Sequence, residues 1–283
     1  MIQFEGVGVD VRGRSDIGRV RRTNQDQFLV AALHKVIDIH DTSLPESYRD
    51  RFDSGARALL FLVADGVGGG PGGEIASSLT LDAIMKYVTN SMRCFYKLDQ
   101  VATTDLMQEL ASSIQESHIR VRAESQHDPA KAGMATTVTM AHVLWPRAYI
   151  VHIGDSRCYR LRGGELHQVT RDQTVSQALV DSGVMTAEQA AVSPYSNMLT
   201  QAVGGSDEVE PALSHLDLET GDVLLMCTDG LTKHVPTTTI GRILQDYPSA
   251  DAAADALVEA ALAGGGTDNV TALVARFVVP DSL

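Results

Sequence analysis

The sequence predicts a mixed α/β fold of the α+β kind, a layered β-sandwich of two mainly antiparallel sheets flanked by helices. Nine runs rich in β-branched and apolar residues have the length of strands. Two helical segments follow one another between the strands that end at Ala64 and begin at Ala135, which strict strand–helix alternation would not produce. Hydrophobic residues make up 44% of the 283 residues, so the chain can bury a sizeable core.

The expected strands share short length, apolar character and flanking turn residues. They lie near residues 6–11, 27–32, 58–64, 135–144, 147–153, 157–161, 165–170, 222–227 and 270–279. The sequence Arg162-Gly163-Gly164-Glu165 predicts a hairpin between two of them, because paired glycines adopt the backbone angles of tight turns.

Apolar residues recur at helical spacing in two long segments, from Glu74 to about Met92 and from about Asp105 to Ala123. Near the end of the chain, Ser249 can cap a third helix, which runs to Leu262 and ends at Gly264.

We expect a single domain over residues 1–283 with two excursions. The first, roughly His34 to Arg57, is polar and predicts a surface insertion. The second, roughly Asp172 to Thr200, contains a short helix ended by Gly183 and a new helix that begins at Thr186, with Gln189 as its capping-box partner. Two helical pieces inserted between strands predict a mobile flap.

Composition limits the classes of partner. The formal charge of −13, from 36 acidic against 23 basic residues, argues against a general nucleic-acid binder. The N-terminus lacks the pattern of a signal peptide, and the longest apolar run, Ala58 to Ala64, is too short to span a membrane. The three cysteines are widely spaced and read as reduced thiols. We therefore expect a cytoplasmic protein with no nucleic-acid or membrane partner.

Four aspartates occupy the same local context at the end of an apolar strand or just before one. They are Asp65, Asp155, Asp229 and Asp268, three of them with glycine close by. A single Asp-Gly after a strand is usually only a turn. Four such carboxylates brought together would repel one another unless a cation lay between them. Because neither Cys nor His accompanies them at ligand spacing, oxygen ligation predicts Mg²⁺, Mn²⁺ or Ca²⁺, in a two-metal site suited to phosphoryl chemistry.

The N-terminal stretch Ser15 to Asp26 supplies positive charge for an anionic phosphate, and Arg21 can bind one bidentately. Six motifs then occur in order between about Asp10 and Val278. They are Arg21-x-x-Asn24-Gln25-Asp26, Asp65-Gly66-Val67-Gly68-Gly69 with Gly73-Glu74-x-Ala76-Ser77, Gly133-Met134-Ala135-Thr136-Thr137, Gly154-Asp155-Ser156-Arg157, Thr228-Asp229-Gly230-Leu231 and Thr267-Asp268-Asn269-Val270-Thr271. Their order resembles that of the metal-dependent protein phosphatases (PPM, the type 2C serine/threonine phosphatases), in particular the stand-alone bacterial members.

The resemblance implies an enzyme that hydrolyses phosphoserine and phosphothreonine with two, or three, Mn²⁺ or Mg²⁺ ions. Asp65 would bridge both metals and the Gly66 carbonyl would bind the second. Asp229 and Asp268 would complete the first metal, and Asp155 would hold a third ion together with Asp229.

Two further roles follow from the same resemblance. Arg21 would grip the phosphate, and Asp26 would orient metal-bound water. Asn269 and Arg157 would brace the site. We expect a monomer that acts on phosphorylated proteins, with a partner serine/threonine kinase acting on the same targets.

Three positions depart from the family pattern. Gln25 stands where some relatives have Glu, and Val67 stands where eukaryotic members have a His thought to protonate the leaving group. Gln173 replaces a His, for which we expect a minor effect on the flap.

Two alternatives remain to be weighed. The spacing Gly68-x-Gly70-x-x-Gly73 matches a dinucleotide-binding fingerprint, but no second parallel strand follows, and Asp65 would face the pyrophosphate. A non-catalytic pseudophosphatase would keep the fold for binding, yet all four metal aspartates are present.

His152 lies in the middle of an apolar strand, which favours a core or supporting role over a catalytic one.

Overall fold

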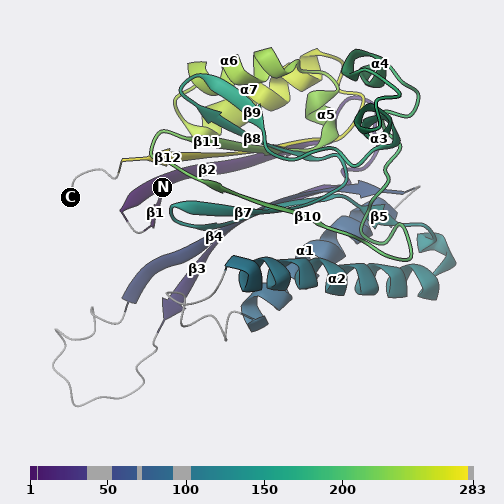
Figure 1. Cartoon of the computed structure of the whole chain (residues 1–283), viewed down its shortest axis with the longest axis horizontal. Coiled ribbons are helices and arrows are strands. Elements are labelled where there is room, and N and C mark those ends of the chain that lie inside the picture. Colours follow the sequence, from purple (N-terminus) through teal and green to yellow (C-terminus); the bar gives the residue numbers. More distant parts are fainter. Residues whose placement is uncertain (5, 37–52, 69–71, 92–102, 280–283) are drawn as a thin grey trace.

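Two antiparallel sheets face each other in the computed structural model, and helices cover their outer sides (Figure 1). The structure describes residues 1–4, 6–36, 53–68, 72–91 and 103–279. The first sheet has the strand order β1 (Ile2–Phe4), β2 (Val7–Asp16), β12 (Val270–Val278), β11 (Val223–Cys227), β8 (Arg157–Arg162) and β9 (Glu165–Gln168). The second has the order β10 (Ala212–Asp217), β7 (Arg147–Ile153), β6 (Val138–Leu144), β4 (Asp53–Val67) and β3 (Asp26–Val36), with β5 (Ala135–Thr136) paired to β4. The predicted sandwich is confirmed.

Helices form the outer layers of the sandwich. On the second sheet lie α1 (Gly72–Ser91) and α2 (Thr103–His127), and on the first lie α6 (Thr237–Asp246) and α7 (Ala250–Ala263) (Figure 1). The remaining short helices are α3 (Val175–Asp181), α4 (Ala187–Ala191), α5 (Asp229–Thr232) and the 3₁₀ turn η3 (Pro129–Lys131). In the part of the chain that the structure describes, no helix has the length and apolar character needed to cross a membrane.

Strand β4 shows why the sequence folds in layers. Successive side chains of a strand point to opposite faces, so the apolar run 58–64 can serve two cores. Leu59, Phe61 and Val63 pack in the cluster between the sheets, whereas Leu60 and Leu62 pack in the cluster beneath α1 and α2. The run is apolar throughout because both faces of the strand are buried.

The antiparallel pairing of β2 and β12 sets the orientation of the sandwich. Gly8 pairs with Val278 at one end, and Asp16 pairs with Val270 at the other. Both ends of the described chain therefore lie at the Gly8–Val278 end, opposite the end that holds α5 and the flap (Figure 1).

Local sequence signals predicted both ends of α7, the start of α4 and the end of α3. The Ser249 hydroxyl accepts a hydrogen bond from the backbone of Ala252, 3.2 Å away, and Gly264 follows the last residue of α7. In the flap, Thr186 and Gln189 form the expected capping box of α4, and Gly183 follows α3 with a φ of +73°.

Several boundaries and elements differ from the sequence-based prediction. The run 135–144 is two strands, broken at Thr137, and the run 165–170 is a strand only to Gln168. Strands β1 and β10 and helices α5 and α6 were not predicted. Strand β10 is an exposed edge strand and so lacks a marked apolar pattern. Helix α6 begins with three threonines, which are weak helix formers, and no side chain caps it.

The predicted insertion at 34–57 is shorter than expected at both sides. Strands β3 and β4 extend into it, with Val36 paired to Asp53. Residues 37–52 lie outside the described part, as do Gly69, Gly70 and Cys94, on which other predictions depended.

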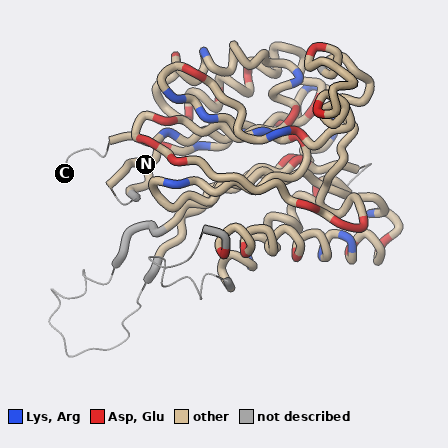
Figure 2. Tube along the Cα trace, in the orientation of Figure 1, with Lys and Arg blue, Asp and Glu red and all other residues tan. Residues whose placement is uncertain are grey.

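Charged residues of both signs are interspersed along both layers of the sandwich (Figure 2). The net charge of −13 is therefore not gathered on one face of the described chain.

Candidate active site

A pocket of about 570 Å³ opens at the end of the sandwich where β4, β7, β11 and β12 meet their connecting turns. All of the predicted site residues except Asp26 line it: Arg21, Asp65, Gly66, Asp155, Asp229 and Asp268. They come from five separate segments of the chain and from both sheets. The prediction that distant carboxylates meet in space is thus supported by the geometry.

Asp26 begins β3 and pairs with Asp65 of β4 in the second sheet. Its side chain reaches Thr271 of β12 and so links the second sheet to the first. It is 3% exposed, and its Oδ2 accepts hydrogen bonds from the hydroxyls of Thr228 at 2.8 Å and Thr271 at 2.7 Å. Its Oδ1 is buried without a partner among the described residues. Burial raises the pKa of Asp26 to about 7, although the two hydroxyls oppose the shift.

Asp65 lines the pocket, and its backbone is held on both sides. Its N–H donates to the Thr137 hydroxyl at 3.0 Å, and its carbonyl accepts from the Thr136 hydroxyl at 2.8 Å. Burial raises the pKa of Asp65 well above its usual range, and the neighbouring aspartates, Asp26 first, raise it further. Such a group is costly to keep ionised unless a cation lies beside it.

The next residue, Gly66, must be glycine because other backbone lies against it. A Cβ at this position would lie 2.2 Å from the carbonyl oxygen of Gly73 and 2.8 Å from that of Gln25. The Gly66 N–H donates to the same Gln25 carbonyl at 3.2 Å. The start of α1 and the loop residue Gln25, just before β3, are thereby brought against the acidic turn.

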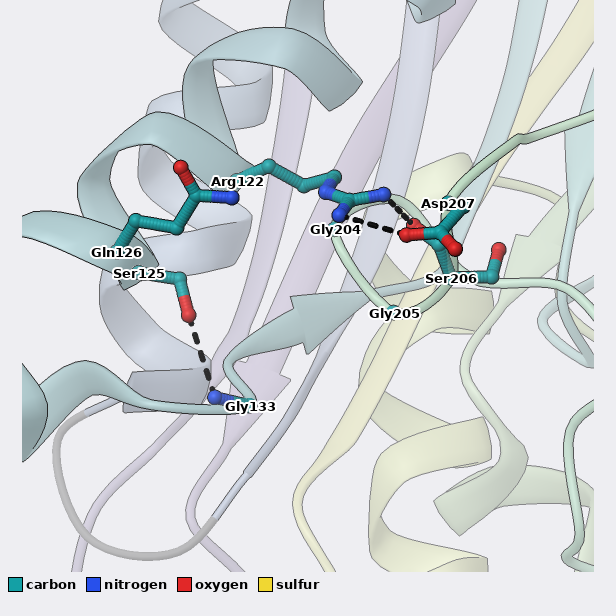
Figure 3. A pocket seen from close by; sticks show the side chains of 8 residues that line it. All are labelled: Arg122, Ser125, Gln126, Gly133, Gly204, Gly205, Ser206 and Asp207. Atoms are coloured by element: carbon teal, nitrogen blue, oxygen red, sulfur yellow. Dashed lines mark hydrogen bonds and ion pairs between the residues drawn. The ribbon is translucent and has the colours of Figure 1, made fainter.

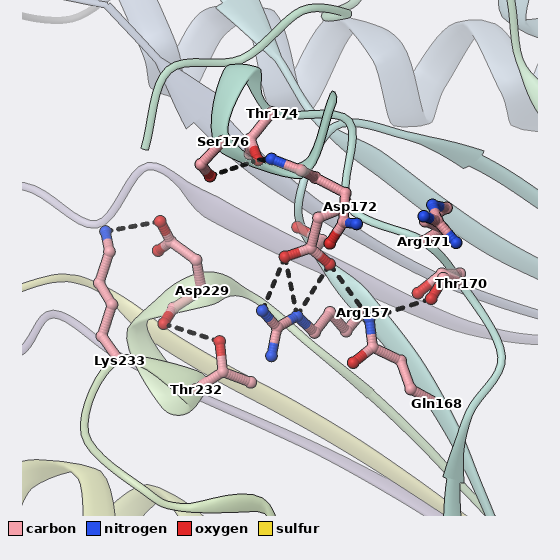
Figure 4. A network of polar contacts seen from close by, with 12 residues as sticks. Arg157, Gln168, Thr170, Arg171, Asp172, Thr174, Ser176, Asp229, Thr232 and Lys233 are labelled. Carbon is pink, nitrogen blue, oxygen red and sulfur yellow. Dashed lines mark hydrogen bonds and ion pairs between the residues drawn. The ribbon is translucent and has the colours of Figure 1, made fainter. Parts of the chain in front are cut away.

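Asp229 and Asp268 are neutralised by basic side chains. Asp268 accepts from Arg21, with Nε 2.7 Å from Oδ1, and Lys233 Nζ lies 3.1 Å from its Oδ2. The same Nζ lies 2.5 Å from Asp229 Oδ2 (Figure 4). Partial burial would raise the pKa of Asp268, but the bonds from Arg21 and Lys233 lower it below its usual value.

Asp155 occupies the turn between β7 and β8. Burial raises its pKa to about 7, with Asp229 as the next cause. The turn is fixed by Gln173, whose side chain accepts from the Gly154 N–H at 2.8 Å, and by Arg157, which binds Asp172 through two guanidinium nitrogens (Figure 4). Both contacts tie the base of the flap to the acidic pocket, so Gln173 has a larger structural part than the sequence suggested.

Asn269 has the contacts of a bracing residue. Its side chain donates to the carbonyls of Ile17 and Thr23 and accepts from the backbone of Gln25. His152 is 2% exposed, bonds to Thr139 and to the Arg171 carbonyl, and does not line the pocket, in agreement with a supporting role.

The donor set fits hard divalent cations. Five aspartates lie close enough to influence one another, and among the described residues only Arg21 and Lys233 form ion pairs with those in the pocket wall. Buried oxygens of Asp26 and Asp229 have no partner within the described ranges. Among the described residues, no group of three or more acidic, His or Cys side chains is arranged to hold a metal ion, and Arg21 and Lys233 pair with Asp229 and Asp268. Oxygen donors with unneutralised charge are what Mg²⁺ and Mn²⁺ require.

A second pocket, of about 530 Å³, adjoins the acidic one and shares Gly133 and Gly205 with it. Arg122 crosses its wall, bonding to the carbonyl of Ser206 at 2.6 Å and to Asp207 at 2.8 Å (Figure 3). It offers polar groups beside the acidic pocket.

Sequence reasoning missed Lys233, Thr228 and Thr271 as members of the site. The two threonines stand inside motifs that were recognised for their aspartates. Lys233 lies four residues after Asp229, one helical turn away, and this spacing was the available signal.

Comparison with known proteins agrees with this geometry. The family model for protein phosphatase 2C matches residues 47–266. Protein phosphatase PhpP of Streptococcus pneumoniae is 31% identical over 259 residues, which cover 91% of this chain and 93% of PhpP. The chain belongs to the protein phosphatase 2C family.

Other members of the protein phosphatase 2C family resemble it in sequence and structure. Serine/threonine protein phosphatase PstP of Mycobacterium tuberculosis is 39% identical over 223 residues, which cover 79% of this chain and 41% of PstP. The chain thus spans about two fifths of that relative. The crystal structure of the M. tuberculosis phosphatase PstP/Ppp superposes with a TM-score of 0.76 at 36% identity, covering 95% of this chain and 98% of the solved one. The structure of the PstP catalytic domain in complex with two manganese ions superposes with a TM-score of 0.74 at 35% identity, covering 96% of this chain and 99% of the solved one.

Proposed function

We propose that this chain hydrolyses phosphoserine and phosphothreonine in proteins, with two, or three, Mn²⁺ or Mg²⁺ ions. The observation that carries the proposal is one pocket lined by four aspartates from both sheets, with a fifth buried close to them and an arginine in its wall. Membership in the protein phosphatase 2C family supports it, as do the printed names of PstP and PhpP. The two manganese ions in the PstP catalytic domain support the choice of cation.

The assignment of ligands is the one that the resemblance to the protein phosphatase 2C family implies. Asp65 would hold both ions, with the Gly66 carbonyl on the second. Asp229 and Asp268 would complete the first, and Asp155 would hold a third together with Asp229. When bound, such ions lower the pKa of coordinated water and neutralise phosphoryl oxygens.

The chain's own groups would bind the phosphate and orient the attacking water. Arg21 is 51% exposed at its side chain, so its guanidinium can exchange Asp268 for a substrate phosphate and bind it bidentately. Oδ1 of Asp26, which has no partner among the described residues, is available to accept a hydrogen bond from water. Val67 carries no acidic proton, so the leaving group would take its proton from water or from another residue.

The cellular setting is part of the same proposal. Residues 1–283 form one phosphatase domain with a flap at about 172–200, acting as a monomer in the cytoplasm on phosphorylated proteins. A serine/threonine kinase acting on the same targets is the expected counterpart. Buried, unpaired Cys158 and Cys227 are compatible with a reducing compartment.

Asp229→Asn tests the proposal, with hydrolysis of a phosphothreonine peptide measured with Mn²⁺ and after chelation. Loss of one metal carboxylate should lower turnover by about 10²–10⁴-fold while circular dichroism shows an intact fold. Asp246→Asn, an exposed carboxylate at the end of α6, is the matched control and should leave turnover unchanged. Full activity of Asp229→Asn, or hydrolysis that survives complete chelation, would contradict the proposal. A wild-type protein that binds Mn²⁺ but hydrolyses nothing would favour a binding role.

A further inference from the structure

Lys233 places its ammonium group between two carboxylates that the proposed function assigns to a metal. Its Nζ lies 2.5 Å from Asp229 Oδ2 and 3.1 Å from Asp268 Oδ2. Two carboxylates that share one compact cation have the arrangement that a bound ion would give them. The ammonium is a strongly hydrated point charge on a flexible stem, whereas a guanidinium is a rigid fork.

The backbone brings Lys233 to this position. Helix α5 starts at Asp229, and the Lys233 N–H donates to the Asp229 carbonyl at 2.8 Å. Gly230 anchors the helix, because a Cβ there would lie only 1.9 Å from the Asn269 carbonyl oxygen. Since the start of the helix is fixed against the segment that carries Asp268, the lysine one turn later is directed at both carboxylates.

One ammonium does not neutralise this part of the site. Lys233 and Arg21 contribute two positive charges against the five aspartates. Oδ1 of Asp229 remains buried with no partner among the described residues, although Lys233 binds the other oxygen. A divalent ion would supply more charge and more directions of bonding than the ammonium does.

The Lys233 side chain can move away from the two carboxylates when an ion binds. Its side chain is 27% exposed and lines the pocket, so the four-carbon stem can carry the ammonium toward solvent. Arg21, by contrast, holds Asp268 with both Nε and a terminal nitrogen.

We propose that Lys233 is a built-in competitor for the metal, which pairs with Asp229 and Asp268 in the metal-free protein and is displaced when a divalent ion binds. The inference rests on the proposed metal site and adds a regulator of its affinity. It follows that Lys233 weakens ion binding and stabilises the metal-free fold.

The test is a Mn²⁺ titration of the full chain, with free Mn²⁺ followed by electron paramagnetic resonance. In Lys233→Met the Kd for Mn²⁺ should fall by about tenfold or more, because a positive charge is removed from the ion's position. The Tm of the metal-free variant should lie below that of wild type, and saturating Mn²⁺ should narrow the gap. Lys86→Met is the matched control, since Lys86 forms the same i,i+4 pair with Asp82 on α1, away from the pocket, and its Kd should equal that of wild type.

The outcomes separate this inference from the proposed function. If wild type does not bind Mn²⁺, the proposed metal site is wrong. If wild type binds Mn²⁺ and Lys233→Met binds it no more tightly, the metal site stands and the competitor role is overturned. Should Lys233→Met not fold without metal, Lys233→Gln is titrated in its place with the same expected fall in Kd, and an unchanged Kd there overturns the inference equally.

Discussion

His142 makes the stability of this protein sensitive to acid. It lies in the middle of β6, paired with Leu60 and Tyr149, and is 1% exposed. Neither ring nitrogen has a hydrogen-bond partner among the described residues, and burial lowers its pKa to about 4. The folded protein therefore keeps this ring neutral at a pH where the unfolded chain would protonate it.

The sign and size of the effect follow from proton linkage. Below the unfolded pKa of about 6.5 the unfolded state binds the extra proton, so stability falls with falling pH until the folded pKa near 4. The full loss is about 3 kcal/mol, and between pH 7.5 and pH 5.0 it is about 2 kcal/mol. Above pH 7.5 the histidine contributes no pH dependence.

Replacing His142 with leucine should remove this loss. We expect urea unfolding, measured in the presence of a chelator, to show that the free energy of unfolding falls between pH 7.5 and pH 5.0 by about 2 kcal/mol more in wild type than in His142→Leu. Other titrating groups contribute equally to both proteins and cancel in the comparison. His215→Leu, which removes an exposed histidine of β10 in the same sheet, is the control. Equal losses in wild type and His142→Leu would refute the reasoning.

Two further substitutions test the phosphate contact and the close backbone approach. Arg21→Ala should raise KM for a phosphopeptide by about tenfold or more and lower kcat less, whereas Arg22→Ala at the exposed neighbouring position should not; an unchanged KM for Arg21→Ala would count against phosphate binding. Gly230→Ala should lower the free energy of unfolding by about 3 kcal/mol, because its Cβ would lie 1.9 Å from the Asn269 carbonyl oxygen. Gly241→Ala is the control, because a Cβ at this position in α6 would meet only the Leu166 side chain, at an ordinary 3.5 Å, and it should raise the free energy of unfolding by about 1 kcal/mol. Equal effects of the two substitutions in urea unfolding would contradict the steric argument.

Much of the fold could be predicted from local patterns, and the exceptions have physical causes. The run 58–64 predicted a strand because both of its faces are buried, and the caps at Thr186 and Ser249 predicted helix starts because their hydrogen bonds are local. Strand β10 could not be found this way, since its side chains are mostly exposed and only its pairing with β7 defines it.

Some residues of the candidate site could likewise be predicted from local patterns, and others could not. The aspartates could be selected because strand ends and adjacent glycines mark them in the sequence, and the order of motifs resembled a family. The i,i+4 spacing from Asp229 was the only sequence signal for Lys233, because its second contact, with Asp268, is 35 residues away in the chain and forms only after folding. The hydroxyls that bind Asp26 likewise come from more than 200 residues away, across the two sheets.

The antiparallel register of β2 and β12 has a practical consequence for experiments on this protein. Eight residue steps separate Gly8 from Asp16, so the Gly8–Val278 end of the sheet lies about 27 Å from its acidic end at the usual rise of a strand. A fluorescent reporter or an immobilisation handle fused at either terminus should stay clear of the pocket mouth. Surface-tethered measurements with bulky phosphoproteins can therefore be made with the opening directed into solution.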